Sequence, residues 1–343
     1  MLHPIKAKPG DRVAVLSPAF AAPAVGPELH EQAMRRLEES TGLLPIEYPT
    51  TRMLDASPEA RAADVDAAFA DPSIRAILAT IGGDDQILVT GHLDPSLPVA
   101  DPKPFLGYSD NTNILNWLWG LGVAGFHGGS TQVHLGAGPA IDDIHLRSLR
   151  AALLDGGDLT LTDPGESEDF GRRWENPESL IEFGDREPTE PWSWSGPARA
   201  ATGRTWGGCL EVLAQLALAD RLPTNDQLRG SVLLIETSER LTPASAVAEY
   251  LRAFGERGLL QAVAGVLVAR PPASTFDVRP DATGRAQWRA AQRGAVTQAV
   301  TRYNPDAVVC VGLPFGHTRP QWILPYGGAI TLDGAARTVT ASY

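Results

Sequence analysis

The chain has 343 residues, a length that suggests two domains and is ample for a large hydrophobic core. Hydrophobic residues make up 43% of it and charged residues 20%, which is the composition of an ordinary globular protein. The formal net charge of -12 argues against a general nucleic-acid binder, because such proteins attract phosphates with clustered basic residues. A small phosphate-bearing substrate is still compatible with this charge, since it needs only a few local hydrogen-bond donors.

Cysteine and histidine usage argues against disulfides and metal sites. Cys209 and Cys310 are the two cysteines, and they lie far apart in apolar runs, so we expect buried free thiols in a reducing compartment. The histidines lack metal-ligand spacing, and we expect neither a metal ion nor an organic cofactor. No apolar run approaches the roughly 18 residues of a membrane span, and no signal peptide is visible. These features predict a cytoplasmic protein without a membrane partner.

Strands alternate with helices in the first part of the chain, residues 1–162. Apolar runs predict strands at 11–16, 44–48, 74–81, 105–107 and 123–126. Periodic patterns and end signals predict helices at 28–40, 58–69, 113–121 and 142–153. This alternation favours an α/β fold with a doubly wound, mostly parallel sheet, in which ligands bind at the carboxyl ends of the strands.

The pattern dissolves between residues 163 and 201, where acidic residues, Pro and Gly dominate. We interpret this stretch as a connection that carries a long loop with Trp174, Trp192 and Trp194, which could equally pack at a domain interface. A second domain is predicted at 202–343. Its strands are expected at 232–235, 263–269, 308–313, 329–332 and 338–341, and its helices at 207–218, 243–254 and 287–303.

Ser109 lies at a strand-to-helix junction. It follows a short apolar strand, and a helix begins directly after it. Such a turn exposes the hydroxyl, and N–H groups at the helix start can stabilise an oxyanion. Ser is also a preferred helix N-cap residue, and the flanks of Ser109 depart from the G-x-S-x-G pattern of hydrolases. On this stretch alone, Ser109 is either a nucleophile or a cap.

Two further polar side chains follow apolar strands. Glu236 comes directly after the strand at 232–235, and His317 follows the strand at 308–313. A histidine can take the proton of a serine, and a carboxylate can orient that histidine and stabilise its charged form. Either residue could instead be a solvated strand end or a turn cap, and His127 is the main rival for the base.

Six motifs occur in order along the chain: Pro9-Gly10-Asp11, Ile81-Gly82-Gly83-Asp84-Asp85, Gly107-Tyr108-Ser109-Asp110, Gly207-Gly208-Cys209-Leu210, Leu234-Ile235-Glu236-Thr237-Ser238-Glu239 and Gly312-Leu313-Pro314-Phe315-Gly316-His317. With them, the chain resembles the LD-carboxypeptidase family of serine peptidases over nearly its whole length. The Glu-Thr-Ser-Glu run and the tryptophan-bearing loop are similar to the branch that contains the microcin C immunity peptidases rather than to the murein-recycling branch.

The resemblance implies a role for several residues. It places the nucleophile at Ser109, the base at His317 and the triad carboxylate at Glu236, with Glu239 as the second choice. The oxyanion hole would use the backbone N–H of Asp110 and one from the double-glycine loop, at Gly83. The family's fold is implied too: a flavodoxin-like N-terminal domain, a smaller α/β C-terminal domain of barrel-like or swivelling character, and a site between them, often in a homodimer.

Substrate contacts are expected at Asp84, Trp174 and Glu239. In the immunity branch a loop aromatic stacks on a nucleobase, and Trp174 is the candidate here. The segment 275–291 looks longer than the family usually has, which could reshape the pocket wall. The resemblance thus implies a serine carboxypeptidase or amidase that acts on an aminoacyl-nucleotide or on an L,D-murein tetrapeptide.

Two other classes of function stay open. The Gly-Gly-Asp-Asp run at 82–85 is similar to the phosphate loop of certain small-molecule kinases, but their fourth glycine is replaced by Asp85, which repels phosphate. A binding protein without catalysis is the other alternative. Separation of Ser109, Glu236 and His317 in space would favour it.

Overall fold

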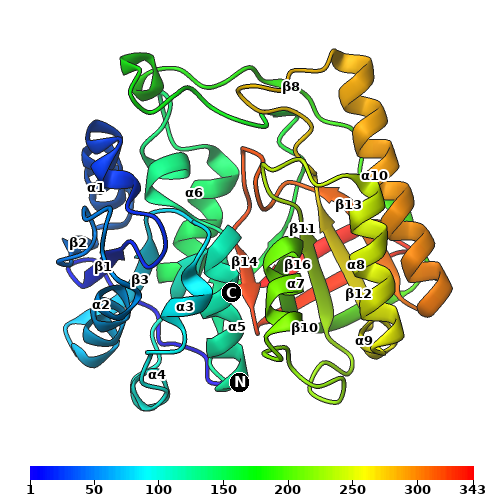
Figure 1. The fold of residues 1–343 in the computed structure, drawn as a ribbon, viewed down its shortest axis with the longest axis horizontal. Coiled ribbons are helices and arrows are strands. Elements are labelled where there is room, and N and C mark those ends of the chain that lie inside the picture. The colour runs from blue at the N-terminus through cyan, green and yellow to red at the C-terminus, as the bar shows by residue number, and fades with distance from the viewer.

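The computed structural model describes all 343 residues, and its strands form two large sheets (Figure 1). The first sheet has the order β14-β5-β4-β3-β1-β2 and consists of β1 (Arg12–Leu16), β2 (Leu44–Glu47), β3 (Ile74–Ala79), β4 (Phe105–Gly107), β5 (Gly125–His127) and β14 (Leu324–Tyr326). All neighbours are parallel except β14, which pairs with β5 in antiparallel fashion. Without β14, the order 2-1-3-4-5 is that of flavodoxin-like sheets, so the predicted doubly wound fold is confirmed.

Helices cover both faces of this sheet, and the longer ones are α1 (Pro27–Thr41), α2 (Pro58–Ala70), α5 (Thr112–Gly120) and α6 (Asp143–Arg150). Side chains along a strand alternate between the two faces of a sheet. Accordingly, Val13 and Val15 of β1 share a core cluster with Leu37 of α1, whereas Ala14 and Leu16 share another cluster with α2. The apolar run of β1 therefore reflects burial on both sides.

Helix ends in this part follow the expected signals. Ser57 accepts a hydrogen bond from the N–H of Ala60 at the start of α2, and Gly42 ends α1 in the left-handed conformation. Shorter turns are η1 (Ala22–Ala24), α3 (Gln86–Val89), α4 (Ser96–Ala100), η2 (Ser109–Asn111), η3 (Thr131–Leu135) and η4 (Ala151–Asp155). The predicted helix at 142–153 therefore changes to the wider turn η4 after Arg150.

The second sheet has eight strands in the order β6-β16-β15-β10-β11-β12-β13-β9. They are β6 (Asp158–Thr160), β9 (Ser193–Ser195), β10 (Ala200–Cys209), β11 (Val232–Glu236), β12 (Gly265–Ala269), β13 (Val308–Leu313), β15 (Ala329–Asp333) and β16 (Thr338–Ser342). The first half of β10 pairs antiparallel with β15, and its second half pairs parallel with β11. One strand thus joins an antiparallel half and a parallel half, and the sheet curls.

The predicted start of one helix in this part, at residue 207, is wrong. Gly207, Gly208 and Cys209 were predicted to open a helix but instead end β10, because their backbone continues the parallel pairing with β11. The helix α7 begins at Leu210, directly after the end of β10. The helices that pack on the sheet are α7 (Leu210–Leu218), α8 (Ala244–Glu256), α9 (Leu259–Ala262) and α10 (Ala282–Tyr303). The last of these starts five residues before the predicted bound at 287, where Asp281 caps it through the N–H of Gly284.

Residues 163–190, here called the strap, pass across the top of the molecule in Figure 1 and contain the short elements β7 (Glu166–Ser167), η5 (Pro177–Leu180) and β8 (Glu187–Pro188). Gln32 of α1 donates to the carbonyl of Leu180, which ties the strap to the first part of the chain. On the other side, Asp169 forms an ion pair with Arg270 of the second part. The strap thus contacts both sheet regions.

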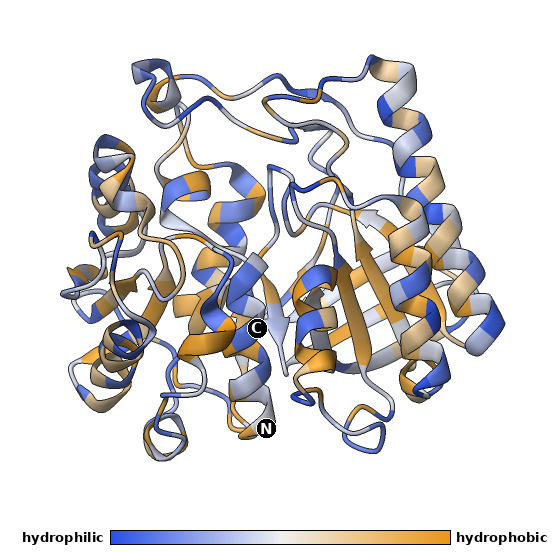
Figure 2. Ribbon diagram, in the orientation of Figure 1, coloured by the Kyte–Doolittle hydropathy of each residue, from blue (hydrophilic) through white to orange (hydrophobic).

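Two short strands lie on the other side of the predicted boundaries at 162 and 202. β6 precedes residue 162 yet pairs with β16 in the second sheet, and β14 follows residue 202 yet pairs with β5 in the first. The strands are mostly hydrophobic, whereas the surrounding helices mix hydrophobic and hydrophilic residues (Figure 2). None of the helices is both long and apolar enough to cross a membrane.

Candidate active site

Ser109 lies two residues after the end of β4, on a strained turn. Its φ of 61° is in the left-handed region, which residues other than Gly and Asn rarely adopt. The Ser109 side chain caps no helix, since neither η2 nor α5 has a side-chain cap. Its hydroxyl instead lies 3.0 Å from Nε2 of His317. Ser109 therefore does not act as a helix cap in this structure.

A hydrogen-bonded chain joins three side chains from distant parts of the sequence. Nδ1 of His317 lies 2.5 Å from Oε2 of Glu236, while its Nε2 faces the Ser109 hydroxyl. Glu236 ends the buried strand β11 and is only 1% exposed. The structure thus brings together the three residues that the sequence singled out, in the order hydroxyl, imidazole and carboxylate.

Glu239 is a second carboxylate beside His317. Its Oε2 lies 3.1 Å from Nε2 of His317, the same nitrogen that faces Ser109. Glu239 has a side chain that is 65% exposed, in contrast to Glu236. The hydrogen bond to His317 lowers the pKa of Glu239 to about 2. Burial lowers the pKa of His317, but the two carboxylates outweigh it and hold this pKa well above its ordinary value.

His127, the rival for the base, lies on the other side of Glu236. Its Nε2 is 3.9 Å from Oε1 of Glu236, and the side chain is fully buried. Burial lowers the pKa of His127 to about 3, so the imidazole is neutral at ordinary pH. Because the Ser109 hydroxyl meets His317 and not His127, the geometry favours His317 as its proton acceptor.

The double-glycine loop lies against the Ser109 turn. A Cβ atom on Gly82 would come within 2.7 Å of Cβ of Ser109 and 3.2 Å of the backbone N of Asp110, so only glycine fits there. The backbone N–H groups of Gly83 and Asp110 both lack an intramolecular hydrogen-bond partner. Two free donors beside a serine hydroxyl are what an oxyanion hole requires.

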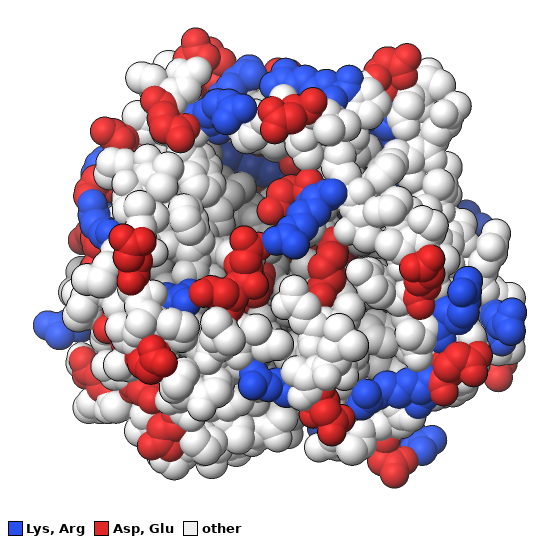
Figure 3. Space-filling model, in the orientation of Figure 1, with Lys and Arg blue, Asp and Glu red and all other residues white.

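A cavity of about 360 Å³ opens in front of Ser109. Figure 3 shows a hollow between the two halves of the molecule, with acidic and basic side chains around it. The predicted substrate contacts Asp84, Trp174 and Glu239 all line the cavity. Asp84 is exposed and forms an ion pair with Arg240, and Trp174 is half-buried.

Sequence reasoning missed several aromatic residues in this wall. Phe20, Phe170 and Phe276 line the cavity, and the rings of Phe170 and Phe276 pack with centroids 4.8 Å apart. Tyr108 places its ring edge-to-face beneath His317, with centroids 5.1 Å apart. Two signals could have found some of them: Phe170 precedes Trp174 by four residues, and Phe276 lies in the segment 275–291 that stood out by its length.

A buried ion cluster fixes the strap to residues 270–273 and to α10. Arg270 donates to Asp169 at 2.7 Å and to Glu187 at 2.8 Å, and the N–H of Ala273 donates to Asp169 at 2.9 Å. Arg289 of α10 also contacts Glu187, and Arg270 and Asp169 have side chains that are 3% and 4% exposed. The cavity wall formed by the strap is therefore anchored to the second part of the chain.

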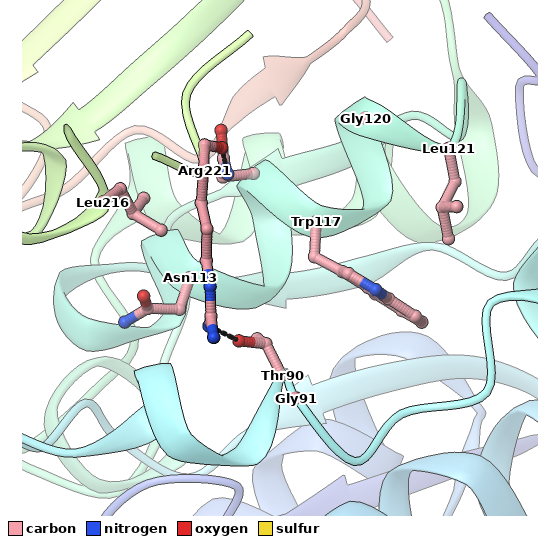
Figure 4. A pocket seen from close by; sticks show the side chains of 9 residues that line it. Thr90, Gly91, Asn113, Trp117, Gly120, Leu121, Leu216 and Arg221 are labelled. Atoms are coloured by element: carbon pink, nitrogen blue, oxygen red, sulfur yellow. Dashed lines mark hydrogen bonds between the residues drawn. The ribbon is translucent and has the colours of Figure 1, made fainter. Parts of the chain in front are cut away.

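A second cavity, of about 430 Å³, lies elsewhere, beside α5 and the end of α7 (Figure 4). Arg221 crosses it and donates to the hydroxyl of Thr90 at 2.9 Å. Trp117 and Leu121 line another side. None of the predicted site residues lines this cavity, so the arrangement around Ser109 is the candidate active site.

Other predicted features were buried cysteines and missing metal ligands. Cys209 and Cys310 are both free and buried, as expected. Cys209 lies near the site, where its Sγ is 3.2 Å from Glu211, and burial raises its pKa well above the ordinary value. No group of three or more His, Cys, Asp or Glu side chains is arranged to hold a metal ion.

Comparisons with known proteins identify relatives of this chain. A putative carboxypeptidase of Vibrio cholerae serotype O1 is 25% identical over 332 residues, which cover 94% of this chain and 92% of the relative. The microcin C7 self-immunity protein MccF of Escherichia coli is 29% identical over 173 residues, which cover 50% of this chain and 49% of the relative. Both relatives fall within the class that the six motifs indicate.

Solved structures share the whole fold. An MccF-like protein from Bacillus anthracis str. Ames has a TM-score of 0.85 at 22% identity and covers 100% of both chains. MccF in complex with aspartyl sulfamoyl adenosine has a TM-score of 0.82 at 21% identity and covers 99% of both chains. Family models match twice, with the LD-carboxypeptidase N-terminal domain at residues 13–128 and the LD-carboxypeptidase C-terminal domain at residues 202–332. The chain therefore belongs to the LD-carboxypeptidase family.

Proposed function

We propose that the protein is a serine carboxypeptidase or amidase that works through an acyl-enzyme. The observation that carries this proposal is the chain of hydrogen bonds from Ser109 through His317 to Glu236. These groups come from three distant segments, and each alone is a common structural residue. Their convergence beside two free N–H donors matches the roles of nucleophile, base, orienting carboxylate and oxyanion hole.

In the first half-reaction, the Ser109 hydroxyl attacks the carbonyl carbon of the substrate amide, and its proton passes to Nε2 of His317. Glu236 holds the imidazole by Nδ1 and stabilises its charged form. The N–H groups of Gly83 and Asp110 bind the oxyanion. The C–N bond then breaks, and His317 returns the proton to the leaving nitrogen. Water repeats these steps to release the acid and free Ser109.

The charges of the site set a condition on this mechanism. His317 must be neutral to accept the proton, yet Glu236 and Glu239 both raise its pKa. Glu239 also lies on the nitrogen that faces Ser109. The substrate therefore has to displace or share the Glu239 carboxylate when it enters, which makes Glu239 part of the substrate pocket.

We propose an aminoacyl-nucleotide amide as the substrate and an L,D-murein tetrapeptide as the alternative. The related MccF binds glutamyl sulfamoyl guanosine and aspartyl sulfamoyl adenosine in solved structures. Here Trp174 lines the cavity and is only half-buried, which supports it as the residue that stacks on a nucleobase. As further proposals, Asp84 contacts the substrate at the mouth, and the protein acts as a homodimer on a small molecule rather than on nucleic acid.

The kinase alternative fits the site less well. Asp85 stands where a phosphate loop needs glycine, and both its carboxylate oxygens accept hydrogen bonds from Arg61 at 2.7 and 2.8 Å. Asp84 adds a second carboxylate at the cavity mouth. Two negative charges on this loop would repel a triphosphate.

The test is hydrolysis of two probes by the wild type and by Ser109→Ala, with a chelator present. One probe is an L,D-tetrapeptide, and the other is aspartyl sulfamoyl adenosine. Cleavage by the wild type alone supports the serine amidase, and the preferred probe selects the substrate class. Equal cleavage by Ser109→Ala would refute the nucleophile. If neither probe is cut, Mg²⁺-dependent ATP consumption would favour the kinase, and its absence the binding protein.

A further inference from the structure

Asn111 joins the two loops that form the proposed oxyanion hole. Its Nδ2 lies 3.0 Å from the carbonyl oxygen of Ile81, just before the double glycine, and 3.0 Å from that of Tyr108, just before Ser109. Both partners are carbonyl oxygens, which only accept, so the side-chain amide must present its N–H₂ group to them. Asn111 is 1% exposed, and both hydrogen bonds are therefore shielded from water.

Gln86 fixes the other side of this amide. Nε2 of Gln86 donates to Oδ1 of Asn111 at 2.8 Å, and Oε1 of Gln86 accepts from the N–H of Ile114 at 3.2 Å. The N–H of Gln86 donates to the carboxylate of Asp110 at 2.9 Å. Gln86 is fully buried at the start of α3. Residues 81–86 and 108–114 are thus joined by four hydrogen bonds, the three of Gln86 and that of Asn111 to Ile81.

Gly107 makes room for this arrangement. A Cβ atom there would come within 2.7 Å of Cβ and 2.8 Å of Cγ of Asn111, closer than real contacts allow. The Asn111 side chain therefore lies directly on the backbone at the end of β4. Such close packing restricts the Asn111 amide to one position and limits the movement of the two loops relative to each other.

We propose that Asn111 is a positioning residue that sets the distance between the two donors of the oxyanion hole, with Gln86 holding its amide in place. This inference rests on the proposed function. The N–H of Gly83 and the N–H of Asp110 come from different loops, so their separation is fixed by whatever links those loops. Asn111 does not line the cavity, and its side chain bonds to Ile81, Tyr108 and Gln86 rather than to Ser109, so it acts through the backbone of the two loops. A misplacement of about 1 Å in such a hole can lower a rate by about 10²-fold.

The test uses Asn111→Asp, which keeps the shape but replaces the N–H₂ donor by an oxygen that repels both carbonyls. Asn116→Asp is the matched control. Asn116 of α5 is likewise a buried asparagine, and its Nδ2 donates to the carbonyl of Arg221 while its Oδ1 accepts from Trp206, away from the site. For each variant, kcat and KM on aspartyl sulfamoyl adenosine, the rate of Ser109 labelling by a fluorophosphonate, and Tm are measured.

We expect Asn111→Asp to lower kcat and the labelling rate by about 10²-fold while KM changes by less than about threefold. Asn116→Asp should lower Tm by a similar amount and leave kcat and the labelling rate near the wild-type values. Equal loss of kcat in both variants would overturn the inference, as would a rise in KM at unchanged kcat. If Asn111→Asp does not fold, Gln86→Met provides the same comparison, because it frees the Asn111 amide without adding a charge.

Failure of the proposed function gives a different result. In that case the wild type itself neither hydrolyses the probes nor reacts with the fluorophosphonate at Ser109. An active wild type with unaffected Asn111→Asp and Gln86→Met variants would overturn only the positioning role.

Discussion

Oε2 of Glu239 and the hydroxyl of Ser109 lie on the same nitrogen of His317, at 3.1 and 3.0 Å. The Ser109 hydroxyl and the Glu239 carboxylate thus compete for a hydrogen bond with Nε2 of His317. Burial lowers the pKa of His317, but Glu236 and Glu239 together hold it well above its ordinary value. In the free site the two carboxylates therefore favour the protonated form of His317, which cannot act as a base.

Glu239→Gln should move the acidic limb of the kcat/KM profile to lower pH. Loss of this carboxylate removes one of the two charges that favour imidazolium, so the pKa of His317 falls and the neutral base persists to lower pH. The profile of hydrolysis between pH 5 and 9 checks this. Asp84→Asn is the control, because that carboxylate also lies at the cavity mouth but pairs with Arg240 instead of His317. A loss of activity at all pH values without a shift would mean that Glu239 only binds substrate.

Trp174→Ala should raise KM for the nucleotide probe by roughly 10-fold to 100-fold, since base–aromatic stacking contributes about 1–3 kcal/mol. KM for the tetrapeptide should change little, and Trp174→Phe should keep most of the nucleotide affinity. Trp192→Ala is the matched control, because Trp192 is half-buried in the same connecting region but does not line the cavity. Equal effects on both probes would indicate that Trp174 supports the strap and not the base.

Arg270→Met should loosen the strap. Its removal leaves the buried carboxylate of Asp169 without its closest ionic partner, a kind of loss that costs about 3–5 kcal/mol. Since the strap carries Phe170 and Trp174, KM for the nucleotide should also rise. Arg285→Met removes a more exposed partner of Glu187 and should cost about 1 kcal/mol or less. Urea unfolding and KM measurements compare the two variants, and equal stability losses would contradict a special role for Arg270.

Much of this site could be predicted from local sequence. The apolar runs of β1 and β3 and the caps at Ser57 and Gly42 predict the first sheet and its helices, because burial and capping act over a few residues. Ser109, Glu236 and His317 stand out since each follows an apolar strand, and family resemblance supplies their roles. Glu239 was the second choice for the triad carboxylate, but its position on the other nitrogen of His317, in addition to Glu236, depends on the path of the loop after β11 and has no local signal.

The other features depend on pairing between segments far apart in the sequence, which limits how well they can be predicted. β14 has three residues and pairs with β5 from almost 200 positions earlier, so no local pattern predicts it. The ten-residue strand β10 was missed because its glycines are typical of turns, whereas here they let the strand approach β11 and Thr112. In the sequence, Asn111 is typical of a helix cap. In the structure, its side-chain amide donates hydrogen bonds to two loops that are brought together only by the sheet.

Asp110 gives a prediction about stability. Burial raises the pKa of its carboxyl group from 3.8 to about 6, and the residue is 2% exposed. Because the folded-state pKa lies above the unfolded-state value, the stability that this group contributes is complete below about pH 4 and is lost as pH rises to about 6. The shift of about 2 pKa units corresponds to about 3 kcal/mol at most.

The Asp110→Asn variant has no titrating group at this position. Between pH 4 and 7 its unfolding free energy should therefore rise relative to that of the wild type by up to about 3 kcal/mol, and the difference should then stay constant. The variant keeps an oxygen for the N–H of Gln86 but turns an N–H₂ group toward the amide of Asn113, so we expect a constant loss at every pH in addition. Urea unfolding at pH 4, 5, 6 and 7 separates the two effects, because only the titration changes the difference between the proteins. If the unfolding free energies of the two proteins differ by the same amount at every pH, the ionised Asp110 carboxylate does not destabilise the folded protein.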